Sequence, residues 1–224
     1  SDKEKKLSKT TTEKDKPVEM VPPEVEKTKG TLTVAFGRFN PPTTGHLKLI
    51  EAVAKEAGQK DDYRIVPSRS FKADKNPLKI DIKLAWMKKM FPKHADNIIS
   101  TPDLNVIIKV MQSFQGIPPD GYTDVCMIVG SDRVQDFTTL LNKYNRDPND
   151  PDKTVEYAFK SIEVKSAGER DPDNDNDVSG MSASKMRGYA KAGKWGEFQN
   201  ALTGLLSADD AAKLMRDVRK GQGL

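Results

Sequence analysis

The pattern of apolar and polar positions changes sharply at residue 31. Residues 1–30 carry eight lysines and seven acidic residues and few large apolar side chains. From residue 31 onward, short runs of β-branched and aromatic residues alternate with segments whose apolar residues recur at helical spacing. This alternation predicts a folded α/β region that follows a polar segment.

The β-rich runs predict five strands, at residues 31–36, 63–66, 97–100, 124–129 and 154–164. Helical spacing predicts helices at residues 45–57, 80–91, 106–114, 134–141, 182–192, 195–205 and 207–220. The run at 124–129 is the most apolar, which is typical of the middle of a buried parallel sheet. The alternation favours a doubly wound, mainly parallel five-stranded sheet. Ligands of such sheets bind beyond the carboxyl ends of the strands, so site residues are expected in the loops that follow them.

Three regions are expected along the chain. Residues 1–30 are predicted to form a disordered arm, because they cannot bury enough apolar surface to offset the entropy lost on ordering. A plain linker and an arm that docks on a protein partner both fit this composition. Residues 31–193 are expected to form the α/β domain, and residues 194–224 a C-terminal helical extension packed on it.

Composition excludes several classes of protein. The 37 basic and 33 acidic residues give a net charge of only +4, which argues against nucleic acid as a partner. No apolar run reaches the roughly 18 residues of a membrane span, and the charged first thirty residues are unlike a secretory signal. The single cysteine, Cys126, excludes an internal disulfide and a cysteine-cluster zinc site. A protein of a reducing compartment, the cytoplasm, is predicted.

A glycine- and proline-rich segment follows the first predicted strand: Gly37-Arg-Phe-Asn-Pro-Pro-Thr-Thr-Gly-His46. Gly37 lets the backbone approach a ligand closely. Gly45 and His46 begin a helix whose N-terminal amides suit an anion. The His46 imidazole can donate to a phosphate oxygen, although a lone histidine after a strand can also serve in capping or packing.

A second candidate segment, Met181-Ser-Ala-Ser-Lys-Met-Arg187, begins a later helix. Ser182 and Ser184 are expected in the first turn, with hydroxyls and free amides that face one anion. Arg187 follows one turn later, so its guanidinium can reach the same anion. An ordinary helix start is the alternative for this segment taken alone.

Two further loops follow predicted strands. After the central strand, Gly130 permits a close approach and Asp132 can accept ribose hydroxyls, although Ser131 or Asp132 can instead cap the next helix. After the second strand, a loop carries three cations for a phosphorylated acceptor or a triphosphate: Arg69, Lys72 and Lys75. A solvated basic loop is the alternative. The acidic segment 171–177 lacks the spacing of a calcium loop and is expected to be a solvated loop as well.

The first segment, Gly37-x-Phe39-x-Pro41-x-Thr43-x-Gly45-His46, resembles the signature of the HIGH superfamily of nucleotidyltransferases. The second segment is similar to the late Ile-Ser-Ser/Thr-Thr-x-x-Arg motif of that superfamily, and the turn at Gly130 resembles its Gly-Ser/Ala-Asp turn. In motif the chain is closest to the nicotinamide-nucleotide and phosphopantetheine adenylyltransferases. The sequence as a whole resembles nucleotidyltransferase-like proteins encoded by large tailed phages, for which the host cytoplasm or the virion is the expected location.

The resemblance implies a Rossmann-like nucleotidyltransferase fold. It also implies transfer of a nucleotidyl group from a nucleoside triphosphate, with ATP favoured, to a phosphorylated acceptor with release of pyrophosphate. Nicotinamide mononucleotide is the leading acceptor, and Mg²⁺ is expected to bridge the substrate phosphates, held more by substrate oxygens and water than by protein carboxylates. The catalytic roles would fall to His46, Thr43 and Arg187. The implied nucleotide-binding residues are Gly37, Arg38, Phe39, Asn40, Gly45, His46, Gly130, Asp132, Ser182, Ser184 and Arg187.

Two other interpretations stay open at this point. One is a cytidylyltransferase that makes a CDP-activated alcohol. The other, of a different class, is a nucleotidyltransferase-like structural or binding subunit of a larger, phage-type assembly, because a fold alone does not establish an activity.

Overall fold

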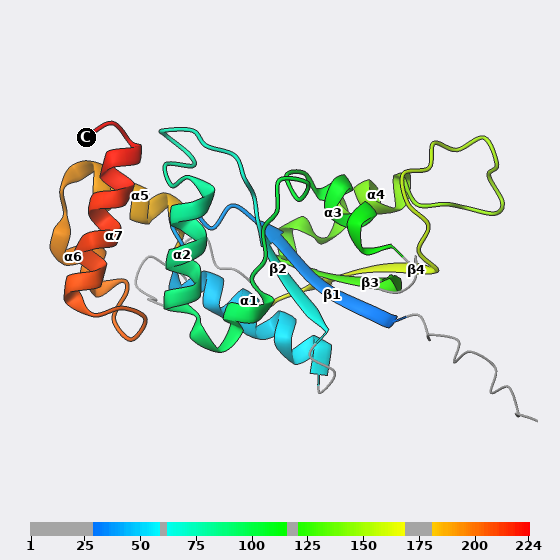
Figure 1. Cartoon of the computed structure of the whole chain (residues 1–224), viewed down its shortest axis with the longest axis horizontal. Helices are drawn as coiled ribbons and strands as arrows, with labels where there is room; N and C mark the ends of the chain where they lie inside the picture. Colours follow the sequence, from blue (N-terminus) through cyan, green and yellow to red (C-terminus); the bar gives the residue numbers. More distant parts are fainter. Residues whose placement is uncertain (1–28, 59–61, 116–120, 169–180) are drawn as a thin grey trace, which may run out of the picture.

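The computed structural model describes residues 29–58, 62–115, 121–168 and 181–224. Within these residues four parallel strands form one sheet in the order β2-β1-β3-β4. The strands are β1 (Lys29–Gly37), β2 (Tyr63–Pro67), β3 (Tyr122–Val129) and β4 (Ser161–Ser166). The predicted α/β fold of the doubly wound type is confirmed (Figure 1). Residues 1–28 of the predicted arm and the acidic segment 171–177 lie outside the described residues.

The sheet has one strand fewer than predicted. Of the expected strand at 97–100, only Ile98 pairs, in an isolated parallel bridge with Ile65 of β2. Asn97 ends a short 3-10 helix, η2 (Pro92–Asn97), and its side chain donates to the Tyr63 carbonyl instead of extending a strand. The bridge lies on the free side of β2, where a fifth strand would have paired.

The other boundary differences are also local. The fifth predicted strand, at 154–164, begins only at Ser161. The preceding Tyr157 and Phe159 are buried beside Asn145, whose side-chain amide exchanges two hydrogen bonds with the Phe159 backbone. At the other end of the domain, β1 begins at Lys29, two residues before the predicted start.

Helices cover both faces of the sheet. On one face lies α1 (Thr44–Ala57), and on the other lie α3 (Ile107–Phe114) and α4 (Val134–Lys143), as Figure 1 shows. Alternation along the strands supplies both cores: in β3, Cys126 and Ile128 face the α1 side, whereas Val125 and Met127 face the α3 side. The fold therefore has two hydrophobic layers, one on each side of the strands.

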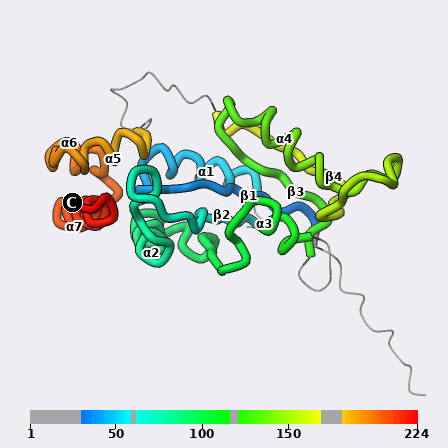
Figure 2. The backbone as a smooth tube through the Cα atoms, turned by 90° about the horizontal axis from the view of Figure 1, so that it is seen from above, coloured from blue at the N-terminus to red at the C-terminus, as the bar shows by residue number. Residues whose placement is uncertain are grey.

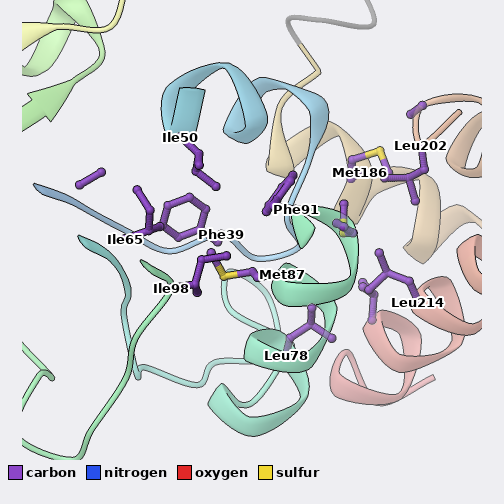
Figure 3. Packing of buried hydrophobic residues seen from close by; sticks show 14 of the residues in the cluster. Phe39, Ile50, Ile65, Leu78, Met87, Phe91, Ile98, Met186, Leu202 and Leu214 are labelled. Carbon is purple, nitrogen blue, oxygen red and sulfur yellow. The ribbon is translucent and has the colours of Figure 1, made fainter. Parts of the chain in front are cut away.

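The remaining helices gather at the end of the sheet where the strands have their carboxyl ends. These are α2 (Ile80–Met90), α5 (Ala183–Ala192), α6 (Trp195–Asn200) and α7 (Ala208–Gly221), which lie next to one another in Figure 2. Figure 3 shows how Met87 of α2, Met186 of α5 and Leu214 of α7 share one apolar cluster with Phe39. Each of these side chains is at most 1% exposed, and burying one completely stabilises the fold by about 1.5–3 kcal/mol.

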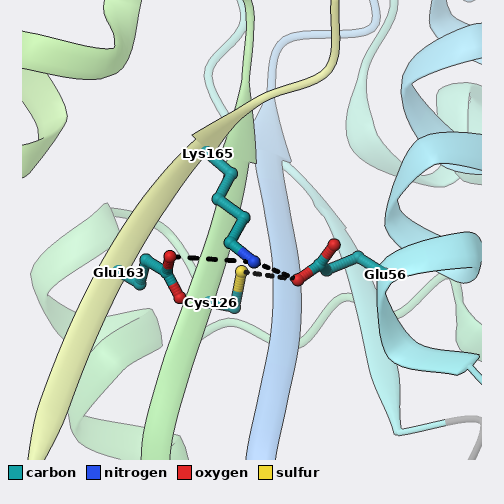
Figure 4. A network of polar contacts seen from close by, with 4 residues as sticks. All are labelled: Glu56, Cys126, Glu163 and Lys165. Carbon is teal, nitrogen blue, oxygen red and sulfur yellow. Dashed lines mark hydrogen bonds and ion pairs between the residues drawn. The ribbon is translucent and has the colours of Figure 1, made fainter.

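A polar network joins α1 to the edge of the sheet (Figure 4). The Lys165 ammonium of β4 lies 2.6 Å from Glu56 of α1 and 3.7 Å from Glu163. The thiol of Cys126 lies beneath it, 3.9 Å from the same Glu56 oxygen, and burial raises the pKa of this thiol to about 11. Cys126 therefore stays protonated at neutral pH, as a structural thiol does.

None of the helices in the described ranges is long and apolar enough to cross a membrane.

Candidate functional site

The candidate site lies where the chain changes direction across the sheet. From β1 the chain passes through α1 to β2 on one side, and it returns through α3 to β3 on the other side of β1. The carboxyl ends of β1 and β3 are therefore neighbours from which loops diverge to opposite faces. Open α/β sheets bind their ligands at such a switch point. The two loops that start here are those of Gly37 and Gly130.

In the loop after β1, Phe39 has a strained backbone conformation. This residue has φ +48°, in the left-handed region that bulky side chains rarely adopt, and its ring is 99% buried. The ring lies 3.2 Å from the position that a Cβ on Gly37 would occupy. A side chain at position 37 would therefore crowd the Phe39 ring, which would have to shift by a few tenths of an ångström. Strained residues of this kind persist where the surrounding structure fixes them, often at binding sites.

Thr43 and His46 form a reciprocal cap at the start of α1. The Thr43 hydroxyl accepts from the His46 backbone N–H at 3.3 Å, and the Nδ1 atom of His46 accepts from the Thr43 backbone N–H at 3.0 Å. Because a backbone N–H can only donate, Nδ1 must carry the lone pair, and a neutral His46 ring has its proton on Nε2. The cap therefore fixes the tautomer and orientation of the imidazole. Thr43 is 99% buried, which makes it the support of His46 in this arrangement.

Arg187 comes to the same loop from the far end of the chain. Its Nη1 donates to the Asn40 carbonyl at 2.9 Å across 147 residues of sequence. The Asn40 side chain is fully buried and pairs with both backbone groups of Leu78, at 2.8 and 3.0 Å. The two sequence segments that carry His46 and Arg187 are thus joined at Asn40.

The charges around Arg187 favour an anion. Burial lowers the pKa of the Arg187 guanidinium, the positive charge of Arg38 acts in the same direction, and Asp74 opposes both. An arginine keeps its proton in proteins despite such shifts, so Arg38 and Arg187 both carry a positive charge. Among the described residues no carboxylate lies within ion-pair distance of Arg187. A guanidinium that has no carboxylate partner among the described residues suits a phosphate group.

The serines before Arg187 occupy the start of α5. Ser182 is the N-cap, one residue before the helix and not within its first turn, and its hydroxyl accepts from the Lys185 backbone N–H at 3.1 Å. Ser184 is exposed in the first turn. The Ser182 hydroxyl therefore supports the helix start, while Ser184 and the first backbone amides of α5 are the groups that suit an anion.

The Gly130 turn follows β3 directly. A Cβ on Gly130 would lie 2.8 Å from the Asp132 carboxylate, so the glycine lets the Asp132 side chain fold back over the turn. Asp132 is exposed in a short 3-10 helix, η3 (Ser131–Arg133). Its position at the switch point is the predicted one, and its role toward a ribose stays a prediction.

The three basic residues of the loop after β2 differ in their surroundings. Arg69 donates to the Ser100 hydroxyl at 2.7 Å, beyond the Ile98 bridge. Lys72 and Lys75 are exposed in a tight turn that the Lys72–Asn76 bridge closes. Of the three, Lys72 and Lys75 are therefore exposed to an incoming anion, whereas Arg69 is half-buried.

Lys83 is a site residue that sequence reasoning missed. Its side chain is fully buried, and its Nζ donates at 2.6 Å to the carbonyls of both Arg38 and Ser68. One ammonium group thereby ties the carboxyl end of β1 to that of β2. Burial lowers the pKa of Lys83 to about 8. The sequence does contain a signal for the burial of Lys83, because this residue lies four positions before Met87 on the apolar stripe of α2.

Within the part of the chain that the structure covers, no three His, Cys, Asp or Glu residues are grouped closely enough to hold a metal ion. The groups that suit an anion are instead the side chains of Arg38 and Arg187 and the backbone amides at the start of α5.

Comparison with known proteins shows the family of the chain. Residues 34–188 match the family described as cytidylyltransferase-like. The matched segment runs from β1 to the residue after Arg187, so it contains all the loops described above, whereas α6 and α7 lie outside it. Comparison with the curated proteins gives no match.

Proposed function

Because the chain belongs to the cytidylyltransferase-like family of nucleotidyltransferases, we propose that it transfers an adenylyl group from ATP to a phosphorylated acceptor and releases pyrophosphate. The observation that supports this most is the hydrogen bond from Arg187 to the Asn40 carbonyl. It brings the late cationic segment to the loop that presents His46. A triphosphate can then contact both segments at once.

In the proposed reaction, an oxygen of the acceptor phosphate attacks the α-phosphorus of ATP. The new bond forms between that oxygen and the α-phosphorus, while the bond from the α-phosphorus to the bridging oxygen breaks and pyrophosphate departs with that oxygen. No protein nucleophile is needed, so the work of the protein is to position the groups and to stabilise charge. Negative charge grows on the α-phosphate oxygens and on the leaving group.

His46 is proposed to act at the α-phosphate. Its cap with Thr43 leaves the neutral ring with an N–H at Nε2, the donor that a non-bridging α-phosphate oxygen requires. Thr43 contributes by holding the ring, since its own hydroxyl takes part in the cap. Thr43 is thus a positioning residue in this scheme, whereas His46 touches the substrate.

Arg187 and the start of α5 are proposed to hold the β- and γ-phosphates. A guanidinium offers planar, paired donors that match phosphate oxygens, and the helix amides add partial positive charge. Arg38, whose positive charge contributes to lowering the pKa of Arg187, is proposed to share the same anion. A magnesium ion bound to the triphosphate would neutralise part of its charge, while Arg187 and the α5 amides hold the phosphates.

The nucleoside and the acceptor are assigned more coarsely. Asp132 in the Gly130 turn is proposed as the ribose ligand, and the preference for ATP over CTP is supported by the resemblance of the motifs to adenylyltransferases. Nicotinamide mononucleotide is the proposed acceptor, with Lys72 and Lys75 as its exposed cations. A cytidylyltransferase that forms a CDP-activated alcohol is the second candidate, which the description of the matched family favours.

The test is pyrophosphate release from each of the four nucleoside triphosphates, combined with nicotinamide mononucleotide, phosphopantetheine and alcohol phosphates. We expect the highest rate with ATP and nicotinamide mononucleotide; a highest rate with CTP and an alcohol phosphate would select the second candidate. Absence of pyrophosphate in every combination would contradict an enzymatic role. Binding of a triphosphate without turnover would instead favour a binding or structural subunit.

The variant that separates chemistry from folding is His46→Gln. Glutamine at this position keeps the Thr-x-x-Gln form of the cap, so the start of α1 stays satisfied while the imidazole is lost. We expect turnover to fall by about 100-fold or more, as when one charge-stabilising donor is removed. The melting temperature should stay close to that of the wild-type protein, and unchanged turnover would exclude His46 from the reaction.

A further inference from the structure

The end of α7 contacts two of the segments that build the candidate site, although it lies outside the family match. Gln222, directly after the helix, donates from its Nε2 to the Arg187 carbonyl at 3.0 Å. This is the only hydrogen bond of the Gln222 side chain among the described residues, because its Oε1 is enclosed without a partner. The C-terminal residues thus reach the backbone of the arginine that is proposed to bind the triphosphate.

The neighbouring Gly221 makes the second contact, with the loop before α2. A Cβ on Gly221 would lie 1.8 Å from the Pro77 carbonyl oxygen and 2.6 Å from its carbon. Only a glycine lets the two backbones approach so closely. The last turn of α7 is therefore packed directly on Pro77.

These contacts form a closed ring of links that includes Asn40 and Arg187. Pro77 precedes Leu78, both backbone groups of Leu78 pair with the Asn40 side chain, and the Asn40 carbonyl accepts from the Arg187 guanidinium. The Arg187 carbonyl then accepts from Gln222, which follows Gly221. Each link joins segments that lie far apart in the sequence. Removing one link leaves Arg187 and the β1 loop less firmly fixed relative to each other.

The helix that provides this brace is itself anchored. Asp217 of α7 accepts from the Trp86 indole of α2 at 2.8 Å, and Asp210 lies 3.0 Å from the Lys89 ammonium of the same helix. Arg219 donates to the Ala190 carbonyl of α5 at 2.5 Å. The apolar side of α7 is fully buried, as Leu214 in Figure 3 illustrates. Because α7 is held rigidly, the single hydrogen bond from Gln222 can fix the position of the Arg187 backbone.

We propose that Gln222 is a positioning residue for triphosphate binding, acting through Arg187. This inference rests on the proposed function, because it takes Arg187 to be a phosphate ligand. Gln222 fixes the backbone of α5 at the residue whose guanidinium must meet the phosphates, and Gly221 fixes the opposite side of the ring at Pro77. A site arranged before the ligand arrives binds it more tightly, because less freedom is lost on binding. The C-terminal helix is in this way part of the nucleotide site.

The test is a double-mutant cycle measured by calorimetric titration of magnesium–ATP into the full chain. Gln222→Leu removes the amide donor, and Gln222→Glu replaces it with an acceptor that repels the Arg187 carbonyl. We expect Gln222→Leu to raise the dissociation constant by about 3- to 10-fold, which corresponds to the loss of one hydrogen bond. In an Arg187→Ala background the same substitution should have no further effect, since the two residues act as one unit.

A matched control and a kinetic readout distinguish positioning from general stability. Gln199→Leu removes a glutamine of α6 whose amide donates at 3.4 Å to the Ala208 carbonyl, away from the ring, and it should leave ATP affinity unchanged. In turnover assays Gln222→Leu should raise the KM for ATP more than it lowers kcat. Equal affinity of wild-type and Gln222→Leu proteins, or the same loss in both backgrounds, would overturn the inference alone. A wild-type protein that binds no magnesium–triphosphate would overturn the proposed function, and this inference with it.

Discussion

Lys83 provides the sharpest test of the structure around the site, through the pH dependence of stability. In the folded protein burial lowers its pKa to about 8, whereas in the unfolded chain it keeps the ordinary value of 10.5. Between these two pH values the unfolded chain binds more protons than the folded one. The contribution of Lys83 to the free energy of unfolding therefore rises as the pH rises through this range, because the folded protein no longer has to bury an ammonium group.

The size of the effect follows from the two pKa values. A change from 10.5 to about 8 corresponds to about 3 kcal/mol, since one pKa unit equals about 1.4 kcal/mol. Lys83→Met keeps the length and apolar character of the side chain and removes the titrating group. Between about pH 8 and pH 10.5 the wild-type protein should gain up to about 3 kcal/mol of unfolding free energy relative to this variant.

The wild-type protein must be compared with Lys83→Met because Cys126 titrates in an overlapping pH range. Its titration changes the free energy of unfolding in the opposite direction to that of Lys83. Burial raises the pKa of Cys126 from 9.0 to about 11, so the stability it contributes is lost as the pH rises toward 11. The contribution of Cys126 to the free energy of unfolding is the same in the wild-type protein and in Lys83→Met. It therefore cancels when one free energy is subtracted from the other. Lys88→Met, at an exposed position of the same helix, serves as the control and should follow the wild-type profile.

The assay is urea unfolding followed by circular dichroism at several pH values between about 7 and 10.5. We expect the profiles of the wild-type protein and Lys83→Met to diverge with rising pH, in favour of the wild type. Parallel profiles would show that Lys83 carries no buried charge in the folded protein. The assignment of its Nζ as the tie between β1 and β2 would then be wrong.

Two further substitutions test other links at the site. Asn40→Ala leaves both backbone groups of Leu78 without their side-chain partner in a buried place, and it should lower the unfolding free energy by about 2–5 kcal/mol in urea titrations; a loss below about 1 kcal/mol would contradict the buried pairing. Gly221→Ala forces the Pro77 backbone to move and should lower the melting temperature measured by calorimetry. Gly196→Ala, a helical glycine with open space around its Cβ position, should leave that temperature unchanged or raise it, and equal behaviour of the two alanine variants would refute the close contact.

The main features of the fold were predictable because they depend on local patterns. Apolar strands that alternate with helices indicate a parallel sheet, and the carboxyl ends of parallel strands meet at one edge. The segments that begin at Gly37 and Gly130 were thus expected in loops at that edge, each directly after a strand. The strand expected at 97–100 does not form, because the side-chain hydrogen bond of Asn97 to the Tyr63 carbonyl competes with strand pairing. The pattern of apolar residues along the sequence does not reveal such a side-chain contact. The roles of the site residues stay predictions.

The parts of the site that sequence reasoning missed depend on tertiary contacts. A lysine such as Lys83 is normally read as exposed, and only the fold shows the two carbonyls that its ammonium bridges. Likewise, Gln222 follows an amphipathic helix without any motif, and its partner Arg187 is 35 residues away. The cap between Thr43 and His46 was closer to prediction, because a Thr-x-x-His pattern at a helix start has the spacing of a capping box.

The central claim is that His46 and Arg187 contact the two ends of one triphosphate. The most direct measurement is a crystal structure with magnesium and an ATP analogue that cannot be cleaved between the α- and β-phosphates. We expect the α-phosphate within hydrogen-bond distance of the His46 Nε2 and the β- or γ-phosphate at the Arg187 guanidinium. A nucleotide bound elsewhere, or phosphates that contact neither side chain, would contradict it.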